Sequence, residues 1–143
     1  MIIYLASDHA AYDMRLEIKS FLDKEGYTTL DLGPFNKDSV DYTDYANALC
    51  EKVLSSNENR GILLCGTGLG MSIAANRHKG IRAALCNHVT LARLSREHND
   101  SNVLVMGARM TGLDLAFDIV LTWLNTGFSG EERHIRRINK LDN

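Results

Sequence analysis

The stretch from Gly61 to Asn76 constrains the fold most strongly. It reads Gly-Ile-Leu-Leu-Cys-Gly-Thr-Gly-Leu-Gly-Met-Ser-Ile-Ala-Ala-Asn. A short apolar run leads into a cysteine and three alternate glycines, and a helical pattern of small residues follows, which predicts a strand, a tight loop and a helix. Glycines permit positive φ angles and leave backbone N–H groups facing outward, where an anion would bind. Such donors favour a thiolate, so Cys65 is a candidate base or nucleophile.

This glycine loop matches neither of the two common phosphate-binding loops. A Rossmann fingerprint requires a third glycine where Met71 stands, and no ribose-binding acid follows the next predicted strand, which ends at Cys86 and Asn87. A P-loop requires a Gly-Lys-Ser/Thr triplet, which the chain lacks. A purely structural turn with a small buried thiol therefore remains the alternative to a catalytic loop.

Length and composition narrow the class of protein. The 143 residues suffice for one core, and we expect residues 1–143 to form a single domain. The hydrophobic share of 45% and the charged share of 24% are ordinary for a globular chain. No apolar run approaches the ~18 residues of a membrane span. The N-terminal residues resemble a strand and not a signal peptide, so we expect no membrane partner and a cytoplasmic location.

Charge and cysteine usage exclude several kinds of site. The net charge of −2 argues against a general nucleic-acid surface. The three cysteines are widely separated, and the five histidines contain no His-x-x-x-His pair. We therefore expect neither a disulfide framework nor structural zinc, and no metal or cofactor. Against the acidic background, the C-terminal segment carries a local basic group at Arg133, Arg136 and Arg137.

Hydrophobic periodicity predicts strands that alternate with helices. We expect strands at residues 2–6, 27–32, 62–64, 81–86 and 103–106. Helices are expected between them, among them segments at about 89–97, 113–125 and 131–140. This alternation predicts an α/β fold, a three-layer α/β/α sandwich around a Rossmann-like sheet of five parallel strands.

Several polar side chains follow the predicted strands, where open α/β sheets bind their ligands. Asp8 and His9 come directly after the first strand, although Asp8 could instead cap the next helix. Tyr42 could line a pocket or lie at the start of a helix. His98 opens a polar stretch that we expect to be a loop; it is either a solvated turn or a proton-transfer group, because histidine exchanges protons near neutral pH.

The C-terminal helix places Arg133 and Arg137 four residues apart, on one face. A solvated basic face is the usual meaning of this pattern. Two guanidinium groups on one face would also hold a phosphate.

Taken together, these residues resemble the ribose-5-phosphate isomerase B family, whose relatives include galactose-6-phosphate and allose-6-phosphate isomerases. The resemblance covers essentially the whole chain. Its most specific parts are the Cys65–Asn76 segment and the His98–Asn99 pair, and the supporting parts are Ser7–Ala10, Asp41–Tyr42, Gly80–Ala83, Gly107–Arg109, Arg133–His134 and Arg137.

The resemblance implies a metal-free isomerisation of ribose 5-phosphate to ribulose 5-phosphate through a cis-enediol, in the non-oxidative pentose phosphate pathway. Cys65 would move a proton between C2 and C1, and His98 would assist ring opening. Asp8 and Asn99 would contact sugar hydroxyls. At the enediolate oxygens the resemblance places Thr67, Gly68, Gly70 and Ser72. At the phosphate it places His9, Arg109, Arg133, His134 and Arg137. The remaining substrate-binding residues would be Tyr42, Gly66 and Leu69.

In that family two subunits build each site. The resemblance therefore implies a homodimer or a dimer of dimers, in which the helix at about 131–140 reaches the partner subunit.

Two alternative functions remain open. An isomerase for a six-carbon phosphosugar would share every residue named above. A non-catalytic phosphosugar or nucleotide sensor would keep the glycine loop and the arginines but would not need Cys65 and His98 together.

Overall fold

The computed structural model describes all 143 residues and contains one sheet of five parallel strands. In space the strands follow the order β2-β1-β3-β5-β4. Their bounds are β1 (Ile3–Ser7), β2 (Thr29–Asp31), β3 (Arg60–Cys65), β4 (Ala83–Leu85) and β5 (Val103–Gly107). The predicted three-layer α/β/α fold with a five-stranded parallel sheet is confirmed.

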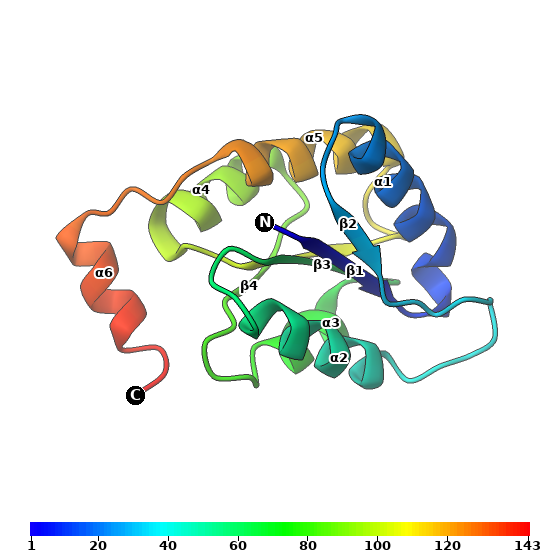
Figure 1. The fold of residues 1–143 in the computed structure, drawn as a ribbon, viewed down its shortest axis with the longest axis horizontal. Coiled ribbons are helices and arrows are strands. Elements are labelled where there is room, and N and C mark those ends of the chain that lie inside the picture. The colour runs from blue at the N-terminus through cyan, green and yellow to red at the C-terminus, as the bar shows by residue number, and fades with distance from the viewer.

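Helices cover both faces of this sheet (Figure 1). α1, α4 and α5 pack on one face, and α2 and α3 pack on the other. α6 stands apart from both layers at the end of an extended segment. The bounds are α1 (Tyr12–Lys24), preceded by the 3-10 turn η1 (His9–Ala11), α2 (Tyr42–Leu54), α3 (Leu69–Ala75), α4 (Val89–Asn99), α5 (Leu113–Asn125) and α6 (Glu132–Asn139).

The core alternates residue by residue along each central strand. In β1, Ile3 and Leu5 pack with the helices of the first face, whereas Tyr4 and Ala6 pack with those of the second. Successive strand residues point to opposite faces of a sheet, so a strand covered on both faces must be apolar throughout. This explains why the central strands read as unbroken apolar runs.

The strand order places a topological switch point at the carboxyl ends of β1 and β3. The chain moves from β1 to one side to form β2, and then returns to form β3 on the other side of β1. Ligands of open α/β sheets bind at such a switch point. The registers Ser7 with Leu64 and Cys65 with Gly107 place the ends of β1, β3 and β5 next to one another.

Three of the expected segments differ from the structure. The edge strands β2 and β4 have only three residues each, because an edge strand pairs with one neighbour. The expected loop at His98 is wrong, since α4 continues through Asn99 and ends at Asp100, which has a φ of 44°. None of the helices has both the length and the apolar composition needed to cross a membrane.

Candidate functional site

Cys65 is the last residue of β3 and is 5% exposed. The chain then reverses at Gly68, whose φ of 84° is readily reached only by glycine. This reversal directs the Gly68 N–H back toward the strand end, and it donates to Cys65 Sγ at 3.1 Å. A backbone donor held on a sulfur stabilises negative charge there. The loop therefore places a backbone donor directly on the Cys65 sulfur.

The other two cysteines have a different environment. Burial raises the pKa of Cys50 to about 12 and that of Cys86 to about 11. All three cysteines are free, but only Cys65 accepts a backbone N–H. No group of three or more His, Cys, Asp or Glu side chains is placed to hold a metal ion.

Gly66 and Gly70 do not supply the positive φ angles that the sequence analysis expected of the loop glycines. Neither has a positive φ. A Cβ on Gly66 would lie 3.1 Å from Arg109 Nη1, and one on Gly70 would lie 2.7 Å from Tyr42 Cζ. These glycines therefore allow Arg109 and Tyr42 to lie against the loop. The structure thus brings Arg109 and Tyr42, both predicted to bind substrate, against the loop that follows Cys65.

Several backbone N–H groups of the loop are unpaired. The N–H groups of Gly66, Thr67 and Gly70 donate to no acceptor in the chain, whereas the Leu69 N–H donates to Thr67 Oγ1 at 3.3 Å. Ser72 lies in the first turns of α3, where its N–H bonds to the Gly68 carbonyl at 3.0 Å. Preorganised, unpaired N–H groups are well suited to stabilise an oxyanion.

Asp8 and His9 lie at the neighbouring end of β1. Asp8 Oδ1 accepts from the N–H groups of Ala10 and Ala11 at 2.9 and 3.2 Å, so the capping role is confirmed. His9 Nδ1 accepts from the Val40 N–H at 3.2 Å. This bond leaves the ring proton of a neutral His9 on Nε2, where it can be donated to a ligand.

Arg15 supports this edge and was missed by the sequence analysis. Its fully buried guanidinium donates to Ser7 Oγ at 2.7 Å and to the Pro34 carbonyl at 2.5 Å. Its Nε lies 2.9 Å from Asp31 Oδ1, an ion pair without good hydrogen-bond geometry. Arg15 therefore links the ends of β1 and β2 through Ser7 and Asp31. Its position on the buried stripe of α1 with Ile18 was the signal that could have revealed it.

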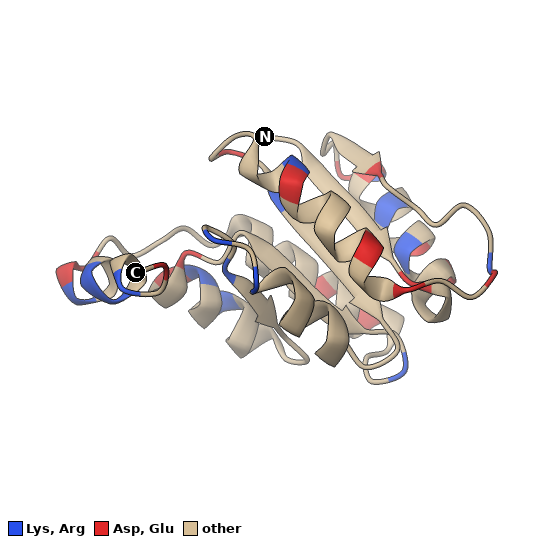
Figure 2. Ribbon diagram, turned by 90° about the horizontal axis from the view of Figure 1, so that it is seen from below, with Lys and Arg blue, Asp and Glu red and all other residues tan.

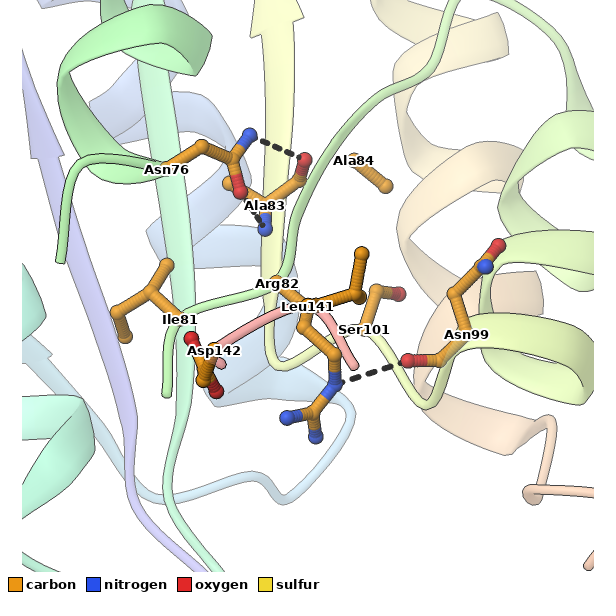
Figure 3. A pocket seen from close by; sticks show the side chains of 9 residues that line it. All are labelled: Asn76, Ile81, Arg82, Ala83, Ala84, Asn99, Ser101, Leu141 and Asp142. Carbon is orange, nitrogen blue, oxygen red and sulfur yellow. Dashed lines mark hydrogen bonds between the residues drawn. The ribbon is translucent and has the colours of Figure 1, made fainter. Parts of the chain in front are cut away.

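His98 and Asn99 lie at the opposite edge of the sheet. α4 returns from the carboxyl edge to the amino edge, so its last turn lies beside the start of β4. The Arg82 Nε donates to the Asn99 carbonyl at 2.9 Å (Figure 3). Asn99 and Arg82 line a cavity of about 420 Å³, which is completed by Asn76, Ile81, Ala83, Ala84, Ser101, Leu141 and Asp142.

α6 adds charge to this amino edge. Figure 2 shows basic residues of α6 in blue at one end of the ribbon, and Figure 1 shows α6 on the side away from the carboxyl ends of the strands. Arg133 and Arg137 are exposed; Arg133 Nε donates to Glu131 Oε2 at 2.8 Å, and Arg137 has no carboxylate partner in the chain. His134 is buried, and its ring stacks on His98 with centroids 4.5 Å apart.

The predicted site residues thus form two groups within one chain. We call the first the carboxyl-edge group; it surrounds the glycine loop and consists of Asp8, His9, Tyr42, Gly66, Thr67, Gly68, Leu69, Gly70, Ser72, Arg109 and Cys65 itself. The amino-edge group consists of His98, Asn99, Arg133, His134 and Arg137. β3 has six residues and so separates the two edges by roughly 20 Å.

Comparison with known proteins gives a consistent result. The family model described as Ribose/Galactose Isomerase matches residues 3–141. The solved ribose-5-phosphate isomerase B of Clostridium thermocellum is 51% identical and superposes with a TM-score of 0.96, over 99% of this chain and 95% of that one. The ribose-5-phosphate isomerase B of Escherichia coli is 40% identical over 97% of this chain and 93% of its own length. A galactose-6-phosphate isomerase subunit, LacB of Clostridium acetobutylicum, is 34% identical over 99% of this chain and 82% of its own length.

Proposed function

Because the chain belongs to the Ribose/Galactose Isomerase family of sugar phosphate isomerases, we propose that it interconverts ribose 5-phosphate and ribulose 5-phosphate through a metal-free cis-enediol. The observation that carries this proposal is the Cys65 sulfur at the end of β3, which accepts the Gly68 N–H beside three unpaired N–H groups. A base next to an oxyanion site is what proton transfer beside a carbonyl requires.

In the proposed step, the Cys65 thiolate takes the proton from C2 of the open-chain aldose. The electrons of that C–H bond form the C1–C2 double bond, and the carbonyl pair moves to O1. The unpaired N–H groups of the loop stabilise this oxygen. The Cys65 proton then returns to C1, the O2 hydroxyl proton moves to O1, and the carbonyl is left at C2.

Ring opening precedes this step, because ribose 5-phosphate is mainly a cyclic hemiacetal. We assign it to His98, which would take the proton of the C1 hydroxyl and deliver one to the ring oxygen as the C1–O bond breaks. Asp8 and Asn99 would hold sugar hydroxyls. His9, Arg109, Arg133 and Arg137 would surround the phosphate, whose binding orients the reacting carbons.

These assignments require two subunits. The amino-edge group cannot reach Cys65 of its own chain, since the two groups occupy opposite edges of the sheet. We therefore propose a homodimer in which α6 and the end of α4 of one subunit complete the carboxyl edge of the other. The two-fold symmetry of such a dimer would produce two equivalent sites.

A six-carbon aldose phosphate is the second candidate substrate, and the galactose-6-phosphate isomerase relative favours it specifically. The test is a comparison of kcat/KM for ribose 5-phosphate, allose 6-phosphate and galactose 6-phosphate, in enzyme dialysed against EDTA. We expect ribose 5-phosphate to give the highest value. A higher value for either six-carbon sugar would reassign the substrate, and binding without turnover of any of them would indicate a sensor.

A further inference from the structure

His134 is the only buried residue of α6. Its ring lies nearly parallel to that of His98, with an angle of 13° between the planes and 4.5 Å between the centroids. Its Nε2 is buried and has no hydrogen-bond partner in the chain. Packing against His98, and not a polar contact, is therefore the interaction that defines the place of this ring.

His98 itself has little else to hold its side chain. The ring is half-buried in the last turn of α4 and forms no hydrogen bond or ion pair within the chain. Proton transfer to a sugar oxygen needs the imidazole at hydrogen-bond distance and in the right direction. A misplacement of about 1 Å can cost roughly 100-fold in rate.

We propose that His134 is a positioning residue, which holds the His98 imidazole in the orientation needed for ring opening, and that it is not a phosphate ligand. This inference rests on the proposed role of His98. The stacked rings restrict the rotamers of His98 from one side, while the polar edge of His98 stays free for the substrate. Stacked rings at this separation attract each other, so the contact resists rotation of the His98 ring.

The charges around the pair fit this role. Burial lowers the pKa of His134, and the charges of Arg133, His98 and Arg137 lower it further, while Glu131 acts in the opposite direction. The charged groups that act on the ring are thus the guanidinium groups of α6, the Glu131 carboxylate just before α6, and the imidazole of α4. The lowered pKa favours the neutral form of His134, which adds no like charge beside His98.

The structure also fixes the segment that carries His134. Before α6, the Ser129 N–H donates to the Glu97 carbonyl at 3.1 Å, one residue from His98. After α6, Asp142 Oδ1 accepts from the Gly80 N–H at 3.1 Å. Attachments on both sides of the helix set the place of His134 over the end of α4.

The first test compares His134→Ala with His134→Phe, because phenylalanine keeps the stack but has no ring nitrogen. Two rates are measured: the isomerisation of ribose 5-phosphate, and the incorporation of deuterium from D2O at C1 of ribulose 5-phosphate. Ribulose 5-phosphate is an open chain, since its O5 carries the phosphate, so exchange into it requires no ring opening. His78→Ala, which removes a histidine at Asn47, is the matched control.

We expect His134→Ala to slow isomerisation roughly 10-fold and to leave deuterium exchange nearly unchanged, and we expect His134→Phe to retain most of the wild-type rate. Equal losses in both variants, with a higher KM in both assays, would show a phosphate contact and overturn the proposal. Equal losses of isomerisation and exchange in His134→Ala would show a general structural role and would also overturn it. Unchanged rates in His134→Ala would show that His134 has no role in ring opening.

A second measurement does not depend on the substrate. A stacked ring shifts the NMR signals of the His98 ring protons upfield, so His134→Ala should move these signals downfield and His134→Phe should not. If the signals of His98 are the same in His134→Ala, the positioning role is wrong even where the isomerase assignment holds. If the wild-type protein does not isomerise ribose 5-phosphate, the proposed function fails, while the NMR result still decides the positioning role.

Discussion

The two edges of the sheet hold functional side chains in different ways. At the carboxyl edge, Cys65 lies in the core and is held by backbone bonds: its carbonyl accepts the Ala108 N–H at 2.8 Å, and its sulfur accepts the Gly68 N–H. At the amino edge, the guanidinium groups of Arg133 and Arg137 project from a helix that stands outside both layers.

This difference in how the side chains are held fits the role proposed for each edge, proton transfer at the carboxyl edge and phosphate binding at the amino edge. A proton-transfer base needs a fixed position, which the backbone of a buried strand supplies. Phosphate-binding arginines need positive charge and access to a ligand, which an exposed helix outside both layers supplies. We therefore expect changes at the carboxyl edge to affect chemistry and folding, and changes at the amino edge to affect binding and assembly.

The largest effect should come from Cys65→Ala. Removal of the proposed base should slow isomerisation by roughly 10³-fold and abolish exchange of the substrate proton with D2O, while phosphate-ligand binding persists. Cys50→Ala is the control, because Cys50 is a buried thiol on the inner face of α2 with no proposed role in catalysis. Proton exchange that survives in Cys65→Ala would show that another group is the base.

Arg137→Ala should have the next largest effect, on kcat/KM. A hydrogen bond to a charged group contributes about 1.5–3 kcal/mol, so we expect a roughly 10- to 100-fold loss. The adjacent Arg136→Ala is the control. A loss of the same size in Arg136→Ala would indicate general electrostatic attraction and not a specific phosphate contact.

Mixing these two impaired variants tests whether the two edges form a shared site across a dimer. If Cys65→Ala and Arg137→Ala subunits exchange at random, half of the dimers are mixed, and each mixed dimer has one intact site. Roughly a quarter of the wild-type activity should therefore return. Confirmed subunit exchange without recovery would mean that each chain serves its own site.

Gly68→Ala should have a moderate effect on stability. The φ of 84° strains any other residue, and the added Cβ would lie 2.5 Å from Leu85 Cδ1. We expect the free energy of unfolding in urea to fall by about 1–3 kcal/mol, with a loss of activity as the N–H leaves the sulfur. Gly112→Ala is the control, because its φ is −68° and no atom lies within 4 Å of a new Cβ. Equal stabilities of the two variants would contradict this account.

The smallest expected effect is a dependence of stability on pH that comes from His134. Its pKa in the folded protein lies below the ordinary value of about 6.5, so the unfolded chain takes up a proton first as the pH falls. The free energy of unfolding should therefore decrease from pH 7.5 towards pH 5, and this decrease should be smaller in His134→Phe. Urea unfolding at both pH values gives the difference, and identical decreases in the two proteins would contradict it.

Much of the molecule could be predicted from local sequence. The expected helix at 113–125 coincides with α5, because its apolar spacing is regular and Gly112 precedes it. The strand, loop and helix around Cys65 were likewise predicted, since a glycine spacing constrains the backbone within a few residues. The edge strands were predicted too long, and His98 was predicted in a loop, because a helix end depends on what satisfies its last carbonyls.

The sequence by itself determined the fold class, the apolar strands and the chemistry available at Cys65 and at the arginines. Only the tertiary structure decided that β5 lies between β3 and β4, that the buried Arg15 bonds to Ser7, and that His134 stacks on His98. It also decided that His98 and Cys65 lie at opposite edges of the sheet. The physical reason is that periodicity records which face of an element is apolar, whereas the partner of that face is set by contacts between residues far apart in the chain.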